Sequence, residues 1–265
     1  MFKKNDPIGI FDSGLGGLTV FRAVRRLMPS ENLIYFGDTA RVPYGAKSKE
    51  AVVSFSKEIA ALLSDRGVKL LIVACNTASS LALEEVRKIS NAPVIGVIEP
   101  GARAACAATV NNRVLVTGTT ATVSSGAYSR ALKKLNPGLV VHEKECPLFV
   151  PLVEEGWCAK KVTELVAAEY LAPFKKKGFD TVILGCTHYP LLKKVIRRVM
   201  GTVKIVDSAE VTAEEARANL VSRNLLNPGG LGRASFIASD APEKFGILAR
   251  RLLGIRTGRV EVKRF

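Results

Sequence analysis

The sequence predicts an α/β protein of two pseudosymmetric domains, in which mostly parallel sheets are flanked by helices. One observation is that apolar runs of strand length alternate with amphipathic stretches of helix length along the chain. Another is an internal repeat, since the run at residues 70–77 recurs in altered form at residues 181–188. Cys186 follows Cys75 by 111 positions, and Val203 follows Pro93 by 110. Matching offsets at two separate strands indicate two similar halves.

The first half shows four apolar runs, each followed by a helical pattern. The run that ends at Cys75 is rich in Val, Ile and Leu, which is typical of a parallel strand buried on both faces. We expect strands at residues 8–11, 33–38, 70–75 and 93–98, with helices at residues 18–27, 48–66, 78–89 and after residue 99.

The second half repeats this order with a polar turn after its first strand. We expect strands at residues 114–117, 139–141, 181–185 and 203–207, a turn at residues 118–120 and a helix at residues 123–135. The remaining chain predicts a helix at residues 209–226, a loop at residues 227–230, a strand at residues 235–238 and a helix at residues 242–253.

This tail has no counterpart in the pattern of the second half. We therefore assign it to the first domain, so that residues 1–98 and 208–265 form one domain and residues 99–207 the other. The chain would then cross between the domains twice, and the active site would lie in the cleft between them. Ligands of parallel sheets bind beyond the carboxyl ends of the strands.

Composition places the chain among globular proteins. Hydrophobic residues make up 48% of the 265 residues, and no apolar run approaches the roughly 18 residues of a membrane span. The first strand follows the N-terminus directly, which leaves no room for a signal peptide, so we expect a cytoplasmic protein without membrane contact. Five scattered cysteines, an odd number, predict reduced thiols rather than a disulfide framework.

The formal net charge of +15 is the one compositional oddity. It would attract anions, including nucleic acid or a small acidic substrate. However, the basic residues fall at apparently solvated positions, and no tract interleaves them with aromatic residues as single-strand binders do. We therefore do not expect a nucleic-acid partner. A basic nucleic-acid-binding protein, in which the cysteines have no catalytic role, is the alternative to an enzyme.

Two loops at strand ends could serve a ligand. Residues 12–17 are rich in glycine, but Thr19 stands where G-x-G-x-x-G needs glycine and no Walker-type lysine follows. The glycines are better explained by a tight turn and close packing. In residues 39–45, Pro43 and Gly45 flank Tyr44, which suggests a shaped binding loop, with a plain turn as the alternative.

The two repeated cysteines are the candidates for chemistry. Cys75 lies between a strand and a helix start, where the field of the helix favours a thiolate. Asn76 and Thr77 are capping residues and could donate to a carboxylate. His188 stands two residues after Cys186 and could pair with its thiolate or donate a proton, whereas His142 reads as structural.

Three chemistries remain open for these groups. A metal site of Cys75, Cys186 and His188 would have unusual ligand spacing. A Cys–His hydrolase would not explain why the cysteine is duplicated. Two thiols facing each other across a cleft suit racemisation or epimerisation, in which one thiolate removes a proton and the other thiol protonates the opposite face. We find no motif for a cofactor that would stabilise the carbanion instead.

Five motifs, in order, resemble those of the glutamate racemases, in the aspartate/glutamate racemase superfamily. They span most of the chain: Asp12-Ser13-Gly14-Leu15-Gly16-Gly17, Val42-Pro43-Tyr44-Gly45, Cys75-Asn76-Thr77-Ala78-Ser79, Gly185-Cys186-Thr187-His188-Tyr189-Pro190 and Val206-Asp207-Ser208-Ala209. The resemblance implies a cofactor-independent, metal-free isomerase that interconverts L- and D-glutamate and supplies D-glutamate for peptidoglycan. An aspartate racemase or another thiol-based racemase is the nearest rival.

The resemblance also implies residue roles. Cys75 would deprotonate D-glutamate and Cys186 L-glutamate, with Asp12 and His188 assisting and Glu154, beside Glu155, as a further acidic partner. The substrate contacts would come from Asp12, Ser13, Pro43, Tyr44, Gly45, Asn76, Thr77, Thr119, Thr187 and His188. Asp12 could pair with the substrate ammonium group, while backbone N–H groups and Asn and Thr side chains hold the carboxylates. Family members are commonly homodimers, so we expect one here.

Overall fold

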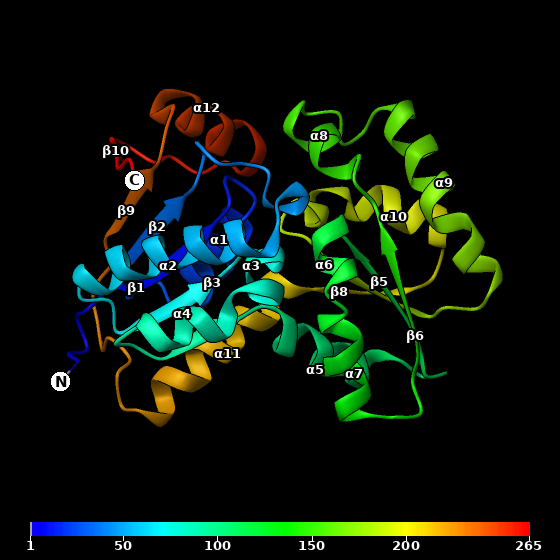
Figure 1. Cartoon of the computed structure of the whole chain (residues 1–265), viewed down its shortest axis with the longest axis horizontal. Coiled ribbons are helices and arrows are strands. Elements are labelled where there is room, and N and C mark those ends of the chain that lie inside the picture. The colour runs from blue at the N-terminus through cyan, green and yellow to red at the C-terminus, as the bar shows by residue number, and fades with distance from the viewer. Residues whose placement is uncertain (1) are drawn as a thin grey trace.

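The computed structural model describes residues 2–265 of the chain. Within these residues the strands form two sheets, and every pair of neighbouring strands is parallel. Figure 1 shows one sheet built from the first part of the chain and its C-terminal end, and the other from the green and yellow middle part. Helices flank both sheets, so the predicted α/β class with parallel sheets is confirmed.

The first sheet has the strand order β10-β9-β2-β1-β3-β4. Its strands are β1 (Ile8–Asp12), β2 (Leu33–Gly37), β3 (Leu70–Val73), β4 (Val94–Gly96), β9 (Ala234–Ala238) and β10 (Val260–Val262). Every residue of β1 and β3 is buried, as expected for central strands with helices on both faces. The tail therefore extends the first sheet, because β9 pairs with β2 and β10 pairs with β9.

The second sheet has the order β6-β5-β7-β8. Its strands are β5 (Arg113–Gly118), β6 (Val140–Glu145), β7 (Thr181–Gly185) and β8 (Lys204–Asp207). This order repeats the β2-β1-β3-β4 part of the first sheet, with β7 at the place of β3 and β8 at the place of β4. The internal repeat read from the sequence is thus also a repeat of topology.

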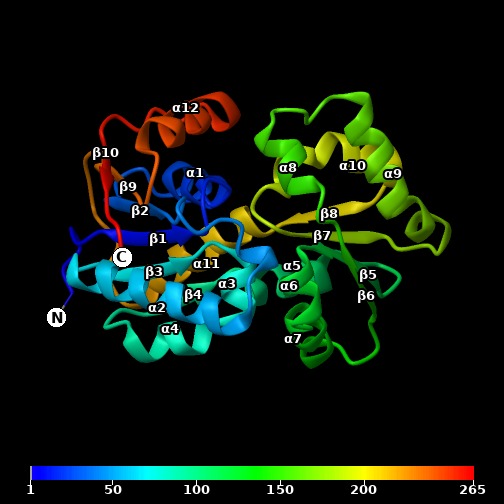
Figure 2. The same cartoon turned by 45° about the horizontal axis from the view of Figure 1, so that its top comes forward.

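Helices cover both faces of each sheet (Figure 2). Those in the half that contains the first sheet are α1 (Leu18–Leu27), α2 (Lys49–Asp65), α3 (Asn76–Leu81), α4 (Leu83–Ile89), α11 (Ser208–Ser222) and α12 (Pro242–Leu253), with the 3₁₀-helix η1 (Tyr44–Ala46). Those in the other half are α5 (Ile98–Ala108), α6 (Thr120–Ser124), α7 (Ala127–Leu135), α8 (Phe149–Glu154), α9 (Lys161–Lys176) and α10 (Lys193–Met200), with the 3₁₀-helix η2 (Tyr189–Leu192).

Several helices differ from the sequence-based expectation. The single helix expected at residues 78–89 is two, α3 and α4, and it begins at Asn76 because the Cys75 side chain caps it. The helix expected at residues 123–135 is also two, α6 and α7, since Gly126 has a φ of 62° and ends the first. The expected turn at residues 118–120 contains the start of α6: Gly118 ends β5, and Thr119 caps the helix, since its hydroxyl accepts from the backbone N–H of Thr122 at 3.3 Å.

Helices α8, α9 and α10 and strand β10 lie outside every residue range that the sequence predicted as helix or strand. Helix α9 carried a readable signal, because its buried residues Thr163, Ala167, Leu171 and Phe174 recur at helical spacing. The strand expected at residues 139–141 is longer, and its exposed positions reflect its place at the edge of the second sheet. The strand at residues 93–98 is shorter, because α5 begins at Ile98.

The two halves meet through the helices that connect the sheets. The chain leaves the first sheet after β4 through α5, which packs on α7 and β7 of the other half, and it returns after β8 through α11, which packs on α1. Helix α3 of the first half also contacts α6 of the second. These contacts bring the carboxyl ends of β3 and β7 toward a common centre (Figure 2). Within residues 2–265 no helix is long and apolar enough to cross a membrane.

Candidate active site

Cys75 follows the end of β3 and caps α3. Its Sγ accepts a hydrogen bond from the backbone N–H of Ala78 at 3.5 Å and lies 3.8 Å from the Oγ of Ser13. Burial raises the pKa of the Cys75 thiol to about 12, and the nearby carboxylate of Asp12 adds to the rise. The bond from Ala78 acts in the opposite direction but is outweighed. The expectation that the helix start favours a thiolate at Cys75 is therefore wrong, because the effect of burial on the thiol pKa is larger.

Cys186 lies at the end of β7 in a different environment. Its Sγ is 3.8 Å from Nδ1 of His188, and Nε2 of the same ring is 3.2 Å from Oε1 of Glu154. No helix begins directly after this cysteine, because η2 starts only at Tyr189. The imidazole, and not a helix N-terminus, is therefore the positive group beside this thiol.

The charge of His188 is set by its two partners. Burial by itself would lower the pKa of the imidazole, but the hydrogen bonds with Cys186 and Glu154 outweigh it and raise the pKa to about 10. The same contact with His188 lowers the pKa of Glu154. The structure thus distinguishes the two acidic candidates, because Glu154 contacts the histidine, whereas Glu155 is exposed and shows no such contact.

Asp12, the last residue of β1, contacts the other half of the molecule through Thr187. It is fully buried, and its carboxylate accepts from the backbone N–H of Gly14 at 3.0 Å and from the hydroxyl of Thr187 at 3.4 Å. The absence of a side chain at Gly16 lets this loop lie close to Thr187 and His188. A Cβ at Gly16 would lie 2.2 Å from Oγ1 of Thr187 and 2.6 Å from Nδ1 of His188. The explanation by close packing, chosen over a phosphate loop, therefore agrees with the structure.

The loop with Pro43, Tyr44 and Gly45 closes one side. The Tyr44 hydroxyl donates to the buried carboxylate of Asp38, which also accepts from Nε of Arg41 at 2.7 Å and from Oγ of Ser239 at 2.7 Å. The hydroxyl is thus already engaged within the first half. Gly45 packs so tightly on Thr119 that a Cβ there would lie 2.7 Å from the Cβ of Thr119.

Hydroxyl and amide groups form another part of the wall. Oγ1 of Thr77 lies 3.0 Å from that of Thr119 and 3.3 Å from that of Thr122, so three hydroxyls from α3 and α6 form a triangle between the halves. Asn76 accepts through Oδ1 from the Tyr128 hydroxyl at 2.7 Å. All these groups are neutral.

Most of the predicted site residues line one cavity between the two sheets. Its wall consists of Ser13, Val42, Pro43, Tyr44, Gly45, Cys75, Asn76, Thr77, Thr119, Val150, Glu154, Cys186, Thr187 and His188. Asp12 is the one predicted residue that lies behind the wall. The open space is about 30 Å³, room for one or two water molecules. The metal interpretation gains no support, because no group of His, Cys, Asp or Glu in residues 2–265 is placed to hold an ion.

Comparison with known proteins gives the family of this chain. The sequence profile of the Asp/Glu/Hydantoin racemase family matches residues 18–216, a range that contains both Cys75 and Cys186. The chain belongs to this family. A glutamate racemase of Geobacter metallireducens is 51% identical over 255 residues, which cover 96% of this chain and 94% of the relative.

Solved structures of the racemase family share the fold over its full extent. The glutamate racemase of Thermus thermophilus, solved with β-chloro-D-alanine, is 48% identical with a TM-score of 0.91, and the match covers 99% of this chain and 98% of that one. The enzyme of Francisella tularensis, solved with D-glutamate, is 39% identical with a TM-score of 0.92, and the match covers 98% of each chain. Both matches span the two sheets and the cavity between them.

Sequence reasoning missed several residues that support this racemase-family cavity. Thr122 and Tyr128 contact predicted residues of the other half, and Asp38 holds Tyr44. Val42 and Val150 add apolar wall. Only Thr122 carried a usable signal, because it stands three residues after Thr119 in a predicted turn next to a helix, at capping spacing. His142 lies apart on β6 and stacks on Phe174 at 4.6 Å, in agreement with its structural interpretation.

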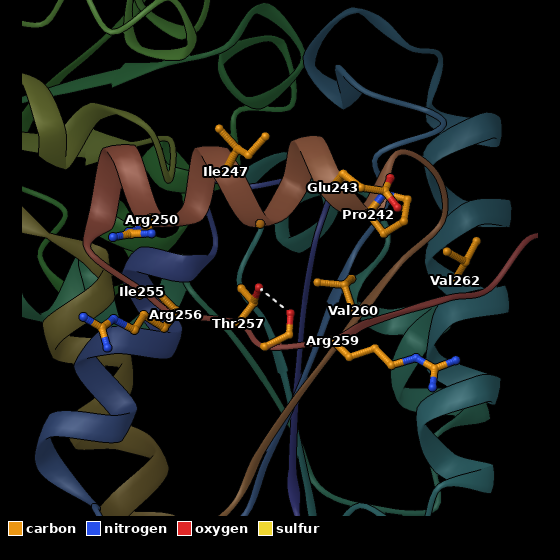
Figure 3. Close-up of a pocket in the computed structure, with 12 residues that line it drawn as sticks. Pro242, Glu243, Ile247, Arg250, Ile255, Arg256, Thr257, Arg259, Val260 and Val262 are labelled. Carbon is orange, nitrogen blue, oxygen red and sulfur yellow. Dashed lines mark hydrogen bonds between the residues drawn. The ribbon is translucent and has the colours of Figure 1, made fainter.

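A larger groove lies away from the cysteines, between α12 and β10 (Figure 3). It encloses about 640 Å³ and includes Arg250, Arg256 and Arg259. Its wall contains no cysteine, histidine or pair of carboxylates, and none of the predicted site residues. The groove therefore offers no groups for proton transfer at carbon.

Proposed function

We propose that this chain interconverts L- and D-glutamate by proton transfer between Cys75 and Cys186, as a glutamate racemase. One observation carries the proposal: the two cysteines end equivalent strands of the two similar sheets and line the same cavity. A carbon held between them has one sulfur available to each face. The product D-glutamate would serve peptidoglycan synthesis.

The two thiols begin the reaction in unequal states. His188 lies beside Cys186 and would stabilise negative charge on its sulfur, whereas burial raises the pKa of the Cys75 thiol to about 12 and favours its protonated form. With L-glutamate bound, the Cys186 thiolate takes the α-proton, and the Cys75 thiol gives its proton to the opposite face. The product is D-glutamate, with Cys186 protonated and Cys75 as thiolate. The return reaction begins from that state, so atoms and charge balance in both directions.

The carbanion between these steps needs stabilisation, because an α-proton of an amino acid is a very weak acid. The cavity wall contains no lysine or arginine. We propose that neutral donors hold the substrate carboxylates, namely the Asn76 amide, the hydroxyls of Thr77 and Thr119, and backbone N–H groups. Asp12, close behind the wall, would attract the substrate ammonium group. Exclusion of water strengthens each of these interactions.

The substrate needs more space than the closed cavity provides. An outer cavity of about 530 Å³ shares Val42, Pro43, Gly45, Thr119, Val150 and Glu154 with the inner one. We propose that glutamate enters through this outer cavity and that the halves separate slightly to admit it. The two units would be the proposed domains, residues 1–98 with 208–265 and residues 99–207.

The proposed function is tested with purified protein and no added cofactor. Chiral chromatography follows D-glutamate formed from L-glutamate and the reverse, with L- and D-aspartate in parallel. We expect both glutamate enantiomers to reach an equal mixture and aspartate to react much more slowly. Racemisation of aspartate alone would favour the rival aspartate racemase, and inactivity toward both would overturn the proposal.

Assembly and location are separate proposals. We propose a homodimer in the cytoplasm, consistent with the five unpaired cysteines, which suit a reducing compartment. Sedimentation velocity at micromolar concentration tests the dimer, and a monomer at every concentration would contradict it.

A further inference from the structure

In the side-chain amide of Asn76, the oxygen accepts a hydrogen bond but the nitrogen has no hydrogen-bond partner among the described residues. Asn76 is 2% exposed and begins α3 directly after Cys75. Its Oδ1 accepts from the Tyr128 hydroxyl at 2.7 Å, but its Nδ2 has no hydrogen-bond partner in residues 2–265. A buried N–H group without a partner is unfavourable. Since Asn76 also lines the cavity, the unsatisfied group points to an acceptor supplied by a ligand.

Tyr128 holds its position through close packing in the other half. It is fully buried on α7 and contacts Gly101 of α5 and Gly185 of β7. A Cβ at Gly101 would lie 3.3 Å from the ring and hydroxyl of Tyr128, and one at Gly185 would lie 3.2 Å from the ring. The two glycines therefore leave a slot in which the ring is fixed, with its hydroxyl directed across the boundary at Asn76.

The hydroxyl decides which way the amide faces. A buried phenol must donate its proton, and Asn76 Oδ1 is the acceptor that the described residues provide. A flipped amide would turn Nδ2 toward Tyr128 and leave the phenol proton without an acceptor. The hydroxyl stays protonated, because burial raises the pKa of Tyr128 above its ordinary range. The Asn76 oxygen is thus kept at Tyr128 and the nitrogen away from it.

We infer that Tyr128 is a positioning residue, which orients the Asn76 amide so that its Nδ2 donates to a carboxylate of the amino-acid substrate. The inference rests on the proposed racemase function and deepens it. A carboxylate is the suitable acceptor, because it has no proton of its own and bonds strongly to neutral donors. Tyr128 itself acts through Asn76 and has no place in the cavity wall.

The test begins with Tyr128→Phe, which removes the hydroxyl and keeps the ring. The lost bond weakens substrate and transition state alike, so KM for both enantiomers should rise by about fivefold to tenfold, with kcat within about twofold. Tyr170→Phe is the matched control, because that hydroxyl lies on α9 and contacts only the backbone of Leu148 among the described residues. Its kinetic constants should equal those of the wild type.

A double-mutant cycle separates positioning from general packing. Asn76→Ala removes the amide, and in that background Tyr128→Phe should not change KM further. Gly101→Ala displaces Tyr128 in a second way, because the added methyl group would push against the Tyr128 ring. This variant should raise KM and leave kcat unchanged. Circular dichroism establishes that each variant is folded.

Three results would decide against the inference. Wild-type KM in Tyr128→Phe or in Gly101→Ala would overturn it while leaving the racemase function intact. An equal effect of Tyr128→Phe with and without Asn76 would show a packing role and would also overturn it. A wild-type protein without glutamate racemase activity would overturn the proposed function, and the inference with it.

Discussion

The imidazole of His188 bonds through Nε2 to Oε1 of Glu154 at 3.2 Å. The opposite ring nitrogen lies 3.8 Å from Sγ of Cys186, so one imidazole links the half-buried carboxylate of Glu154 on α8 to the buried thiol that follows β7. Cys75 has no such partner and contacts Ser13 and the backbone of Ala78 instead. The two sheets are similar, but the chemical settings of their cysteines are not.

This contact predicts a role for Glu154 in holding His188 charged. We expect Glu154→Gln to lower kcat/KM by about tenfold, less than the roughly 100-fold or more for a group that transfers the proton itself, because Glu154 acts through His188. The loss should be the same for L- and D-glutamate, because enantiomers have an equilibrium constant of one. Steady-state assays in both directions measure it. Glu155→Gln is the control and should leave kcat/KM unchanged, since Glu155 is exposed and does not contact the histidine.

The same histidine predicts a pH dependence of stability. Its pKa is raised from 6.5 to about 10, and Cys186, Glu154 and Asp12 are the groups that favour its charge. The contribution of charged His188 to the free energy of unfolding is complete below about pH 6.5. Between there and about pH 10 the folded state keeps a proton that the unfolded state loses, so the free energy of unfolding falls by up to about 1.4 kcal/mol per pH unit. Urea unfolding of wild type and His188→Gln measures the difference, and parallel curves would contradict the assignment.

Close packing at Gly16 predicts that even a methyl group is harmful there. In Gly16→Ala the Cβ would overlap the Thr187 hydroxyl and the His188 ring, which would have to move away. A displacement of about 1 Å at reacting groups costs about 100-fold in rate, so we expect kcat/KM to fall by that order. Gly229→Ala is the control, because nothing lies within 4 Å of a Cβ at that position. Equal kcat/KM in the two variants would show that the close packing of Gly16 on Thr187 and His188 is not needed for activity.

A buried ion pair predicts a stability effect far from the cysteines. Lys69 Nζ lies 2.6 Å from Oε2 of Glu31, with side chains 0% and 1% exposed. Lys69 also donates to the carbonyl of Leu225 at 2.9 Å, and Glu31 accepts from the backbone of Asn227 at 2.8 Å. The pair thus ties the chain after α11 to the start of β3.

Removing one charge leaves the other buried without a partner. Lys69→Met should lower the free energy of unfolding by about 3–5 kcal/mol, measured with urea, without changing kcat of the folded enzyme. Breaking the exposed pair of Arg26 and Glu210 by Arg26→Met should cost less than about 1 kcal/mol. Similar losses in both variants would contradict the special role of the buried pair.

The sequence was most informative where the signal is local and repeated. Cys75 and Cys186 were proposed as the catalytic pair because each follows an apolar run, and the similar offsets of 111 and 110 residues between the halves also predicted the repeated topology. Partners from distant parts of the chain could not be predicted in this way. Tyr128 lies 52 positions from Asn76, and its role depends on how its ring packs against α5 and β7. The thiol pKa of Cys75 was predicted in the wrong direction, because burial in the assembled cavity outweighs the local helix start.

The central claim is that Cys75 and Cys186 act on opposite faces of one carbon. The most direct measurement follows the α-proton of L- and D-glutamate in D2O by NMR for the wild type, Cys75→Ser and Cys186→Ser. Inversion with deuterium uptake is expected for the wild type and its loss for both variants. Any remaining exchange should be confined to L-glutamate in Cys75→Ser and to D-glutamate in Cys186→Ser. Inversion at the wild-type rate in either variant would contradict the two-thiol mechanism. Equal deuterium exchange of L- and D-glutamate in a single variant would also contradict it.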